Sequence, residues 1–198
     1  SDLGLIDCLC NAAGATTRGS LLDTTPELFD QHIALNLRAP FFTMQAAVRD
    51  MIARGAAGTV VNIITMSSYG GQPFLAPYSA SKAGLVGLTK NAAHAHRWDR
   101  VRINGLNISW TGTEGEALVQ KRFHDAPDDW AERAGRELPA GRLASARDAA
   151  AAYASLARRQ GAPRSEQPDA VLPPRRGTSP PRNGCPGAPA PSEKSLWA

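Results

Sequence analysis

The chain has 198 residues, 42% of them hydrophobic, and a formal net charge of +4. That length predicts one domain, and so modest a charge does not call for a nucleic-acid partner. Because no run of eighteen apolar residues occurs, no membrane span is expected, and the three cysteines favour reduced thiols in a cytoplasmic protein.

The first predicted helix begins near Pro26. The sequence Thr24-Thr25-Pro26-Glu27 places a proline in the first turn and contains a Thr-x-x-Glu capping box. Apolar residues then recur every three or four positions, which predicts one buried face; they are Phe29, Ile33, Leu37, Phe41, Met44, Val48 and Ile52. Pro40 has no N–H for the carbonyl of Asn36, so either the helix kinks there or an ordered water binds that carbonyl.

Residues 58–65 form a β-branched apolar run of strand length after a glycine. This pattern is typical of a strand covered on both faces in a parallel sheet. Thr65, Ser67 and Ser68 follow at its C-terminal end, where open α/β sheets place their ligands. We therefore expect hydroxyl groups at a binding site beyond this strand.

A second predicted helix, Pro77 to Arg97, is rich in small and apolar residues and is expected to be buried. It carries Tyr78 and Lys82 four residues apart, on one face and about 5–6 Å from each other at Cβ. A nearby ammonium lowers the pKa of a tyrosine, which would suit Tyr78 to act as a general acid or base. The same pair also occurs on ordinary surface helices, so a structural interpretation stays open.

Four ordered motifs resemble those of the Rossmann-type short-chain dehydrogenases/reductases. They are Asn11-Ala12-Ala13-Gly14, Asn36, a hydroxyl residue after Ile64, and Tyr78-x-x-x-Lys82. The resemblance covers roughly residues 3–158. It implies an α/β fold, here a partial doubly wound parallel sheet with flanking helices.

The resemblance implies a catalytic role for four of these residues. Tyr78 would exchange a proton with a carbonyl or secondary alcohol, and Lys82 would bind the nicotinamide ribose and lower the pKa of the tyrosine. Asn36 would hold a proton-relay water through its backbone carbonyl. Thr65, thirteen residues before the tyrosine, stands where the family usually has the serine that polarises the substrate carbonyl, with Ser67 as the alternative.

The implied cofactor is NAD or NADP. Its candidate contacts are Asn11, Ala12, Gly14, Tyr78, Lys82, Thr111 and Thr113. The implied partner is a small carbonyl compound or alcohol, with homo-oligomers expected of the intact family member and no nucleic acid or membrane. No metal site is predicted, since His94 and His96 face different directions on their helix and the other two histidines are isolated.

The sequence departs from the family pattern near its beginning. It contains 18 glycines but no Gly-x-Gly, so it has no glycine-rich turn of the kind that holds the cofactor pyrophosphate. The segment Leu5 to Cys10 resembles the fourth strand of the family fold, and the first three strands are expected to be missing. Cys8 and Cys10 would point to one face of that buried strand.

The C-terminal half contains a predicted substrate lid and a predicted tail. Residues 114–139 resemble the family's variable lid, although a polar surface helix is the alternative. Residues 1–160 form the predicted domain, whose last helix begins with a Ser145-x-x-Asp148 capping box. Residues 161–198 contain nine prolines and four glycines, which predicts a disordered tail.

Two functions stay open from the sequence. The first is an NAD(P)-dependent oxidoreductase that interconverts a carbonyl and a secondary alcohol. The second is a non-catalytic truncated remnant, or an interaction module, of the same fold.

Overall fold

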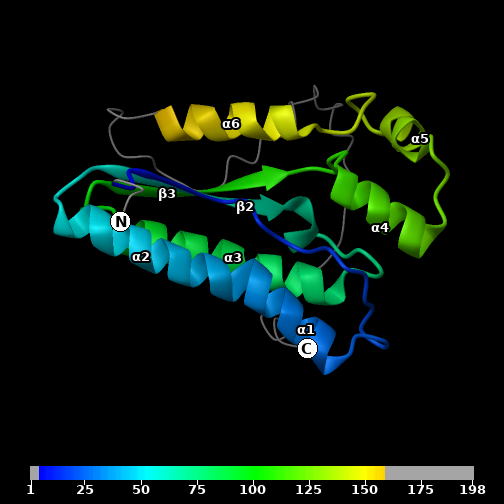
Figure 1. Cartoon of the computed structure of the whole chain (residues 1–198), viewed down its shortest axis with the longest axis horizontal. Coiled ribbons are helices and arrows are strands. Elements are labelled where there is room, and N and C mark those ends of the chain that lie inside the picture. The colour runs from blue at the N-terminus through cyan, green and yellow to red at the C-terminus, as the bar shows by residue number, and fades with distance from the viewer. Residues whose placement is uncertain (1–4, 159–198) are drawn as a thin grey trace, which may run out of the picture.

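The computed structural model describes residues 5–158, which form three layers with a sheet between helices (Figure 1). Within this part of the chain, three parallel strands lie in the order β1 (Cys8–Asn11), β2 (Gly58–Thr65) and β3 (Val101–Ile108). The predicted Rossmann-like parallel sheet with flanking helices is confirmed. Strand β2 has the predicted bounds.

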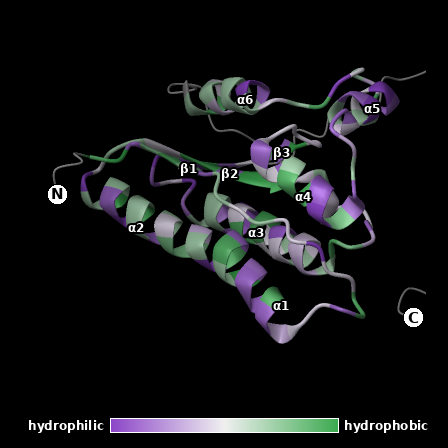
Figure 2. Cartoon of the chain, turned by 45° about the vertical axis from the view of Figure 1, so that its right-hand side comes forward, coloured by the Kyte–Doolittle hydropathy of each residue, from purple (hydrophilic) through white to green (hydrophobic). Residues whose placement is uncertain are grey.

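Helices α2 and α3 cover one face of the sheet, and α6 covers the other (Figure 1). Helices α4 and α5 lie beyond the ends of the strands, and α5 is mostly hydrophilic (Figure 2). The helical segments are α1 (Pro26–Ile33), the π-helical η1 (Ala34–Arg38), α2 (Ala39–Ala53), the 3-10 turn η2 (Met66–Ser68), α3 (Ala76–Ala95), α4 (Glu114–His124), α5 (Trp130–Glu137) and α6 (Ala146–Arg158). None of the helices within residues 5–158 is long and apolar enough to span a membrane.

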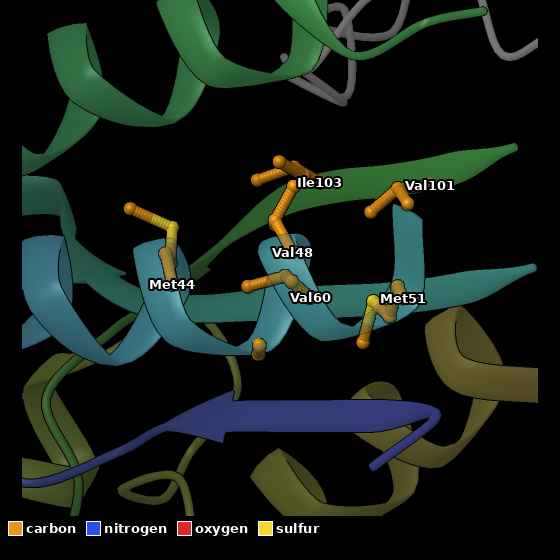
Figure 3. Packing of buried hydrophobic residues seen from close by; sticks show 7 residues of the cluster. Met44, Val48, Met51, Val60, Val101 and Ile103 are labelled. Carbon is orange, nitrogen blue, oxygen red and sulfur yellow. The ribbon is translucent and has the colours of Figure 1, made fainter. Parts of the chain in front are cut away.

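The main hydrophobic core lies between α2 and the sheet. Figure 3 shows side chains of α2 packed against the strands, and the labelled residues are Met44, Val48, Met51, Val60, Val101 and Ile103. Gly58 begins β2 where a Cβ would collide with Met51 Sδ, so the close approach of helix and strand depends on that glycine.

The buried face of α1, η1 and α2 differs from the predicted apolar stripe. Buried positions occur at His32, Asn36, Pro40, Met44, Ala47, Val48 and Met51. The prediction is therefore right for Met44 and Val48, but it is wrong for Phe29, Phe41 and Ile52, which are 43%, 43% and 41% exposed. The inward face begins with polar residues, so apolar periodicity alone places that face incorrectly.

The predicted capping box at the start of α1 is also wrong by one residue. Thr25 is the N-cap, and its hydroxyl accepts a hydrogen bond from the Leu28 N–H at 3.3 Å. The Thr24 hydroxyl instead donates to the Ser20 carbonyl. The second predicted capping box does form, because Ser145 Oγ accepts from the Asp148 N–H at 3.1 Å and Asp148 Oδ2 accepts from the Ser145 N–H at 2.8 Å.

Strand β1 lies at one edge of the described sheet. Leu5 and Ile6 before it are 70% and 46% exposed, and Cys8 and Cys10 are exposed free thiols. The expectation of buried cysteines is therefore wrong, because α6 reaches that side of the strand only in part, with the Tyr153 hydroxyl 3.1 Å from Cys8 Sγ. The predicted tail, residues 161–198, lies outside the described residues.

A polar network ties β1 to the elements on either side. Thr43 of α2 donates to Asn11 Oδ1 at 2.7 Å, and Asn11 Nδ2 donates to Asn62 Oδ1 at 2.8 Å. Asn62, which is fully buried and pairs with Asn11 in the strand register, donates to Thr89 Oγ1 of α3 at 2.9 Å. Satisfied buried amides of this kind fix one register of β1 against β2.

Candidate active site

A cavity of about 1160 Å³ lies at the carboxyl ends of the three strands, and its walls come from the segments that follow each strand and from α4 and α6. Six predicted site residues line it, as does the alternative Ser67; the six are Ala12, Gly14, Thr65, Tyr78, Thr111 and Thr113. The other predicted residues, Asn11, Asn36 and Lys82, lie outside the cavity wall. The predicted site residues therefore form two sets, one that lines the cavity and one that lies behind the cavity wall.

Tyr78 enters the cavity from the first turns of α3, and Thr65 at the end of β2 lines the same cavity. Burial raises the pKa of Tyr78, and the hydrogen bond from Thr65 opposes that rise. Glu116 raises the pKa further, whereas Arg18 lowers it. The predicted lowering of the Tyr78 pKa is therefore wrong for this structure, because burial outweighs the charges around the phenol.

Lys82 lies one turn after Tyr78 and is only 5% exposed. Its ammonium donates to the Ile63 carbonyl at 2.9 Å. A Cβ added to Gly14 would lie 3.5 Å from Lys82 Nζ and 3.2 Å from Asn36 Oδ1, so these three residues meet behind the cavity. Burial lowers the pKa of Lys82 to about 8.

The buried ammonium predicts a pH-dependent stability. The folded-state pKa of Lys82 is about 8 and its ordinary value is 10.5, so between these values the unfolded chain binds more protons and stability rises with pH. We expect wild type to gain up to about 3 kcal/mol relative to Lys82→Met between pH 7 and pH 10.5. Urea denaturation of both proteins across this range measures the gain, and a constant difference would contradict it.

Asn36 lies in the π-helical segment η1, where the Ala39 N–H reaches back five residues to the Ala34 carbonyl. The structure has a π-helical turn before Pro40, because proline cannot supply the N–H of a regular turn at Asn36. The kink and the water bound to the Asn36 carbonyl stay predictions. The fully buried Asn36 side chain accepts from the Ala15 N–H at 2.9 Å and donates to the Ala15 carbonyl at 3.0 Å. It thereby holds the loop that follows β1.

Asn36 also connects this loop to α3. Its amide donates to Ser81 Oγ at 3.0 Å, and the Ser81 hydroxyl donates to the Tyr78 carbonyl at 2.7 Å. Gly84, one turn further along α3, packs so closely on Leu37 that a Cβ would lie 2.9 Å from a Leu37 methyl. This residue of the small-residue face of α3 therefore serves internal packing.

The three hydroxyl groups after β2 differ in their hydrogen-bond partners. Thr65 Oγ1 accepts from the Ser67 N–H at 3.3 Å, and Ser67 Oγ donates to Gln72 Oε1 at 2.7 Å. Ser68 Oγ is buried and has no hydrogen-bond partner among the described residues. Thr65 and Ser67 both line the cavity.

Helix α4, within the predicted lid, closes one side of the cavity. The Thr113 hydroxyl caps it by accepting from the Glu116 N–H at 3.1 Å, and Thr111 donates to the Ser109 carbonyl at 2.9 Å. Arg18, after β1, donates to Glu116 Oε1 at 3.2 Å across a sequence separation of 98 residues. Sequence reasoning missed this ion pair because no local pattern links residues so far apart.

The comparisons with known proteins agree with this fold. The family model described as enoyl-(acyl carrier protein) reductase matches residues 1–162. Carbonyl reductase (NADPH) 2 of Sus scrofa is 38% identical over 105 residues, which are 53% of this chain and 43% of the relative. Gluconate 5-dehydrogenase of Gluconobacter oxydans is 36% identical over 142 residues, which are 71% of this chain and 53% of the relative.

Among solved structures, a gluconate 5-dehydrogenase from Burkholderia cenocepacia in complex with NADP and tartrate has a TM-score of 0.69 and 30% sequence identity. The match covers 78% of this chain and 58% of that one. The chain belongs to the short-chain dehydrogenase/reductase family. It spans about half the length of the curated relatives it matches.

Proposed function

We propose that the chain is the carbonyl-binding part of an NAD(P)-dependent oxidoreductase that interconverts a carbonyl and a secondary alcohol. The observation that carries this proposal is that Tyr78 and Thr65 lie on the wall of one cavity, with the Lys82 ammonium buried behind it. Two hydroxyl groups that converge on one cavity suit the recognition of a single substrate oxygen.

In this proposal Tyr78 is the general acid. Its raised pKa keeps the phenol protonated at neutral pH, so it can donate a proton to the oxygen of a carbonyl as that oxygen gains negative charge. Thr65 donates a hydrogen bond to the same oxygen. Lys82 places a positive charge near the site, and Asn36 holds the loop and α3 in position.

The cofactor we propose is NAD or NADP, and the residues present fit its nicotinamide side. Ala12, Gly14, Thr111 and Thr113 line the same cavity as Tyr78, and a Cβ at Gly14 would lie 3.2 Å from Asn36 Oδ1. When bound, the nicotinamide supplies the hydride. The sequence has no Gly-x-Gly to hold the pyrophosphate, so these residues account for only part of a cofactor site.

A non-catalytic remnant or interaction module is the second candidate, and the missing Gly-x-Gly favours it. For the intact protein we also propose a cytoplasmic homo-oligomer that acts on a small carbonyl compound or alcohol. The free thiols of Cys8 and Cys10 support the cytoplasmic location, and the exposed rings of Phe41 and Phe42 on α2 support the oligomer.

Substitutions at Thr65 test the proposed carbonyl site. They are made in a restored chain, defined as this chain preceded by the strands and glycine-rich turn of the Burkholderia cenocepacia relative. We expect Thr65→Ser to keep most of the NADPH-dependent ketone reduction and Thr65→Val to lose roughly 10- to 100-fold in kcat/KM, because only serine preserves the donor. If Thr65→Val reduces the ketone as fast as wild type, the hydrogen bond to the carbonyl oxygen comes from Ser67 or Ser68 instead.

A further inference from the structure

Two charged residues of opposite sign stand on the cavity wall near Tyr78. Arg18 comes from the loop after β1 and Glu116 from α4, and each is 13% exposed. Among the described residues that line the cavity, these two alone carry full charges. The wall near Tyr78 is therefore electrically balanced.

The guanidinium of Arg18 is already occupied by protein acceptors. Its Nη2 donates to Glu116 Oε1 at 3.2 Å, its Nη1 donates to the Thr16 carbonyl at 3.0 Å, and its Nε donates to His124 Nε2 at 3.2 Å. These bonds use three of the five N–H groups of the guanidinium, so fewer donors remain for a substrate carboxylate.

The carboxylate of Glu116 is held just as firmly. Trp110 Nε1 and Gln120 Nε2 donate to its Oε1 at 3.0 Å and 2.8 Å, in addition to Arg18. A substrate carboxylate that approached Arg18 would meet this fixed negative charge at close range. Like charges in a partly buried site cost several kcal/mol, and the pair thus acts against anions.

We propose that the Arg18–Glu116 pair makes the cavity selective for an uncharged carbonyl compound over one that bears a carboxylate. This inference rests on the proposed oxidoreductase function, since it names the substrate class of the same site. It distinguishes the chain from relatives named for gluconate, which is itself a carboxylate. Arg18 and Glu116 line the same cavity as Tyr78, the proposed proton donor.

The test compares two aryl ketones of nearly equal shape, 4-acetylbenzamide and 4-acetylbenzoate. Ligand-observed NMR titrations at pH 8 measure their binding to the chain itself, because binding requires no turnover. We expect wild type to bind the amide at least about 10-fold more tightly than the benzoate, a difference of about 1.4 kcal/mol. Tighter binding of the benzoate by wild type would overturn the inference.

Three variants test whether the charge pair causes this preference. Glu116→Gln keeps the size and the acceptor oxygen but frees the Arg18 charge, so the benzoate should gain about 10-fold. Arg18→Met should shift the ratio the opposite way, toward the amide. Glu114→Gln is the matched control, since this exposed glutamate of the same helix has no hydrogen-bond or ion-pair partner among the described residues, and it should leave the ratio unchanged.

An unchanged ratio in Glu116→Gln would also overturn the inference. NADPH-dependent reduction of the two ketones by the restored chain separates this inference from the proposed function. If neither ketone is reduced while the binding preference and its response to Glu116→Gln persist, the proposed chemistry fails and the selectivity of the charge pair is supported.

Discussion

Tyr78→Phe in the restored chain is expected to lose about 10²–10⁴-fold in the rate of ketone reduction while its fold stays intact. The substitution removes only the hydroxyl that we propose as the proton donor and keeps the ring that packs at the start of α3. Steady-state rates of NADPH oxidation with a fixed ketone measure the effect.

Tyr69→Phe is the matched control for this experiment. Tyr69 is 50% exposed, does not line the cavity, and undergoes the same chemical change in the variant. Its rate should stay close to that of wild type. If Tyr78→Phe also keeps most of its rate, the proton donor is a different group and the proposed role of Tyr78 is wrong.

Cofactor affinity should differ greatly between the chain and the restored chain. Dinucleotides owe much of their affinity in this fold to a pyrophosphate held by backbone N–H groups at the start of a helix after a glycine-rich turn. We expect the chain itself to bind NADPH with a Kd weaker than about 1 mM and the restored chain to bind about 1000-fold more tightly. Isothermal titration calorimetry with NADPH and NADH measures both.

A restored chain in which valines replace the glycines of the added turn is the control, and it should return to weak binding. Micromolar binding of NADPH by the chain itself would contradict the prediction. It would mean that Ala12, Gly14, Thr111 and Thr113 hold the cofactor without a pyrophosphate loop. Weak binding by both chains would favour the remnant over the oxidoreductase.

Regular elements could be predicted from the sequence where local chemistry alone determines them. The bounds of β2 follow from a β-branched run, and the cap of α6 follows from Ser145 and Asp148, because these signals act within a few residues. The inward face of α1 and η1 could not be predicted from apolar periodicity. It is formed by His32 and Asn36, whose burial depends on partners far away in the sequence.

In the candidate site, too, some features could be predicted from the sequence and others could not. The spacing of Tyr78 and Lys82 placed them one turn apart on α3, as predicted, but their pKa values depend on burial, which spacing does not reveal. The Arg18–Glu116 pair was missed for a related reason. Thr113-x-x-Glu116 indicates a helix start, but no residue near it predicts that Glu116 forms an ion pair with Arg18 in the loop after β1.

Deuterium transfer tests the central claim most directly, namely that this site reduces a carbonyl with Tyr78 as the acid. The restored chain and its Tyr78→Phe variant are incubated with 4-acetylbenzamide and NADPH deuterated at the transferable C4 position, and the alcohol is analysed by mass spectrometry. The account predicts one deuterium on the carbinol carbon with wild type and little product with the variant. Alcohol without deuterium, or equal product from both proteins, would contradict it.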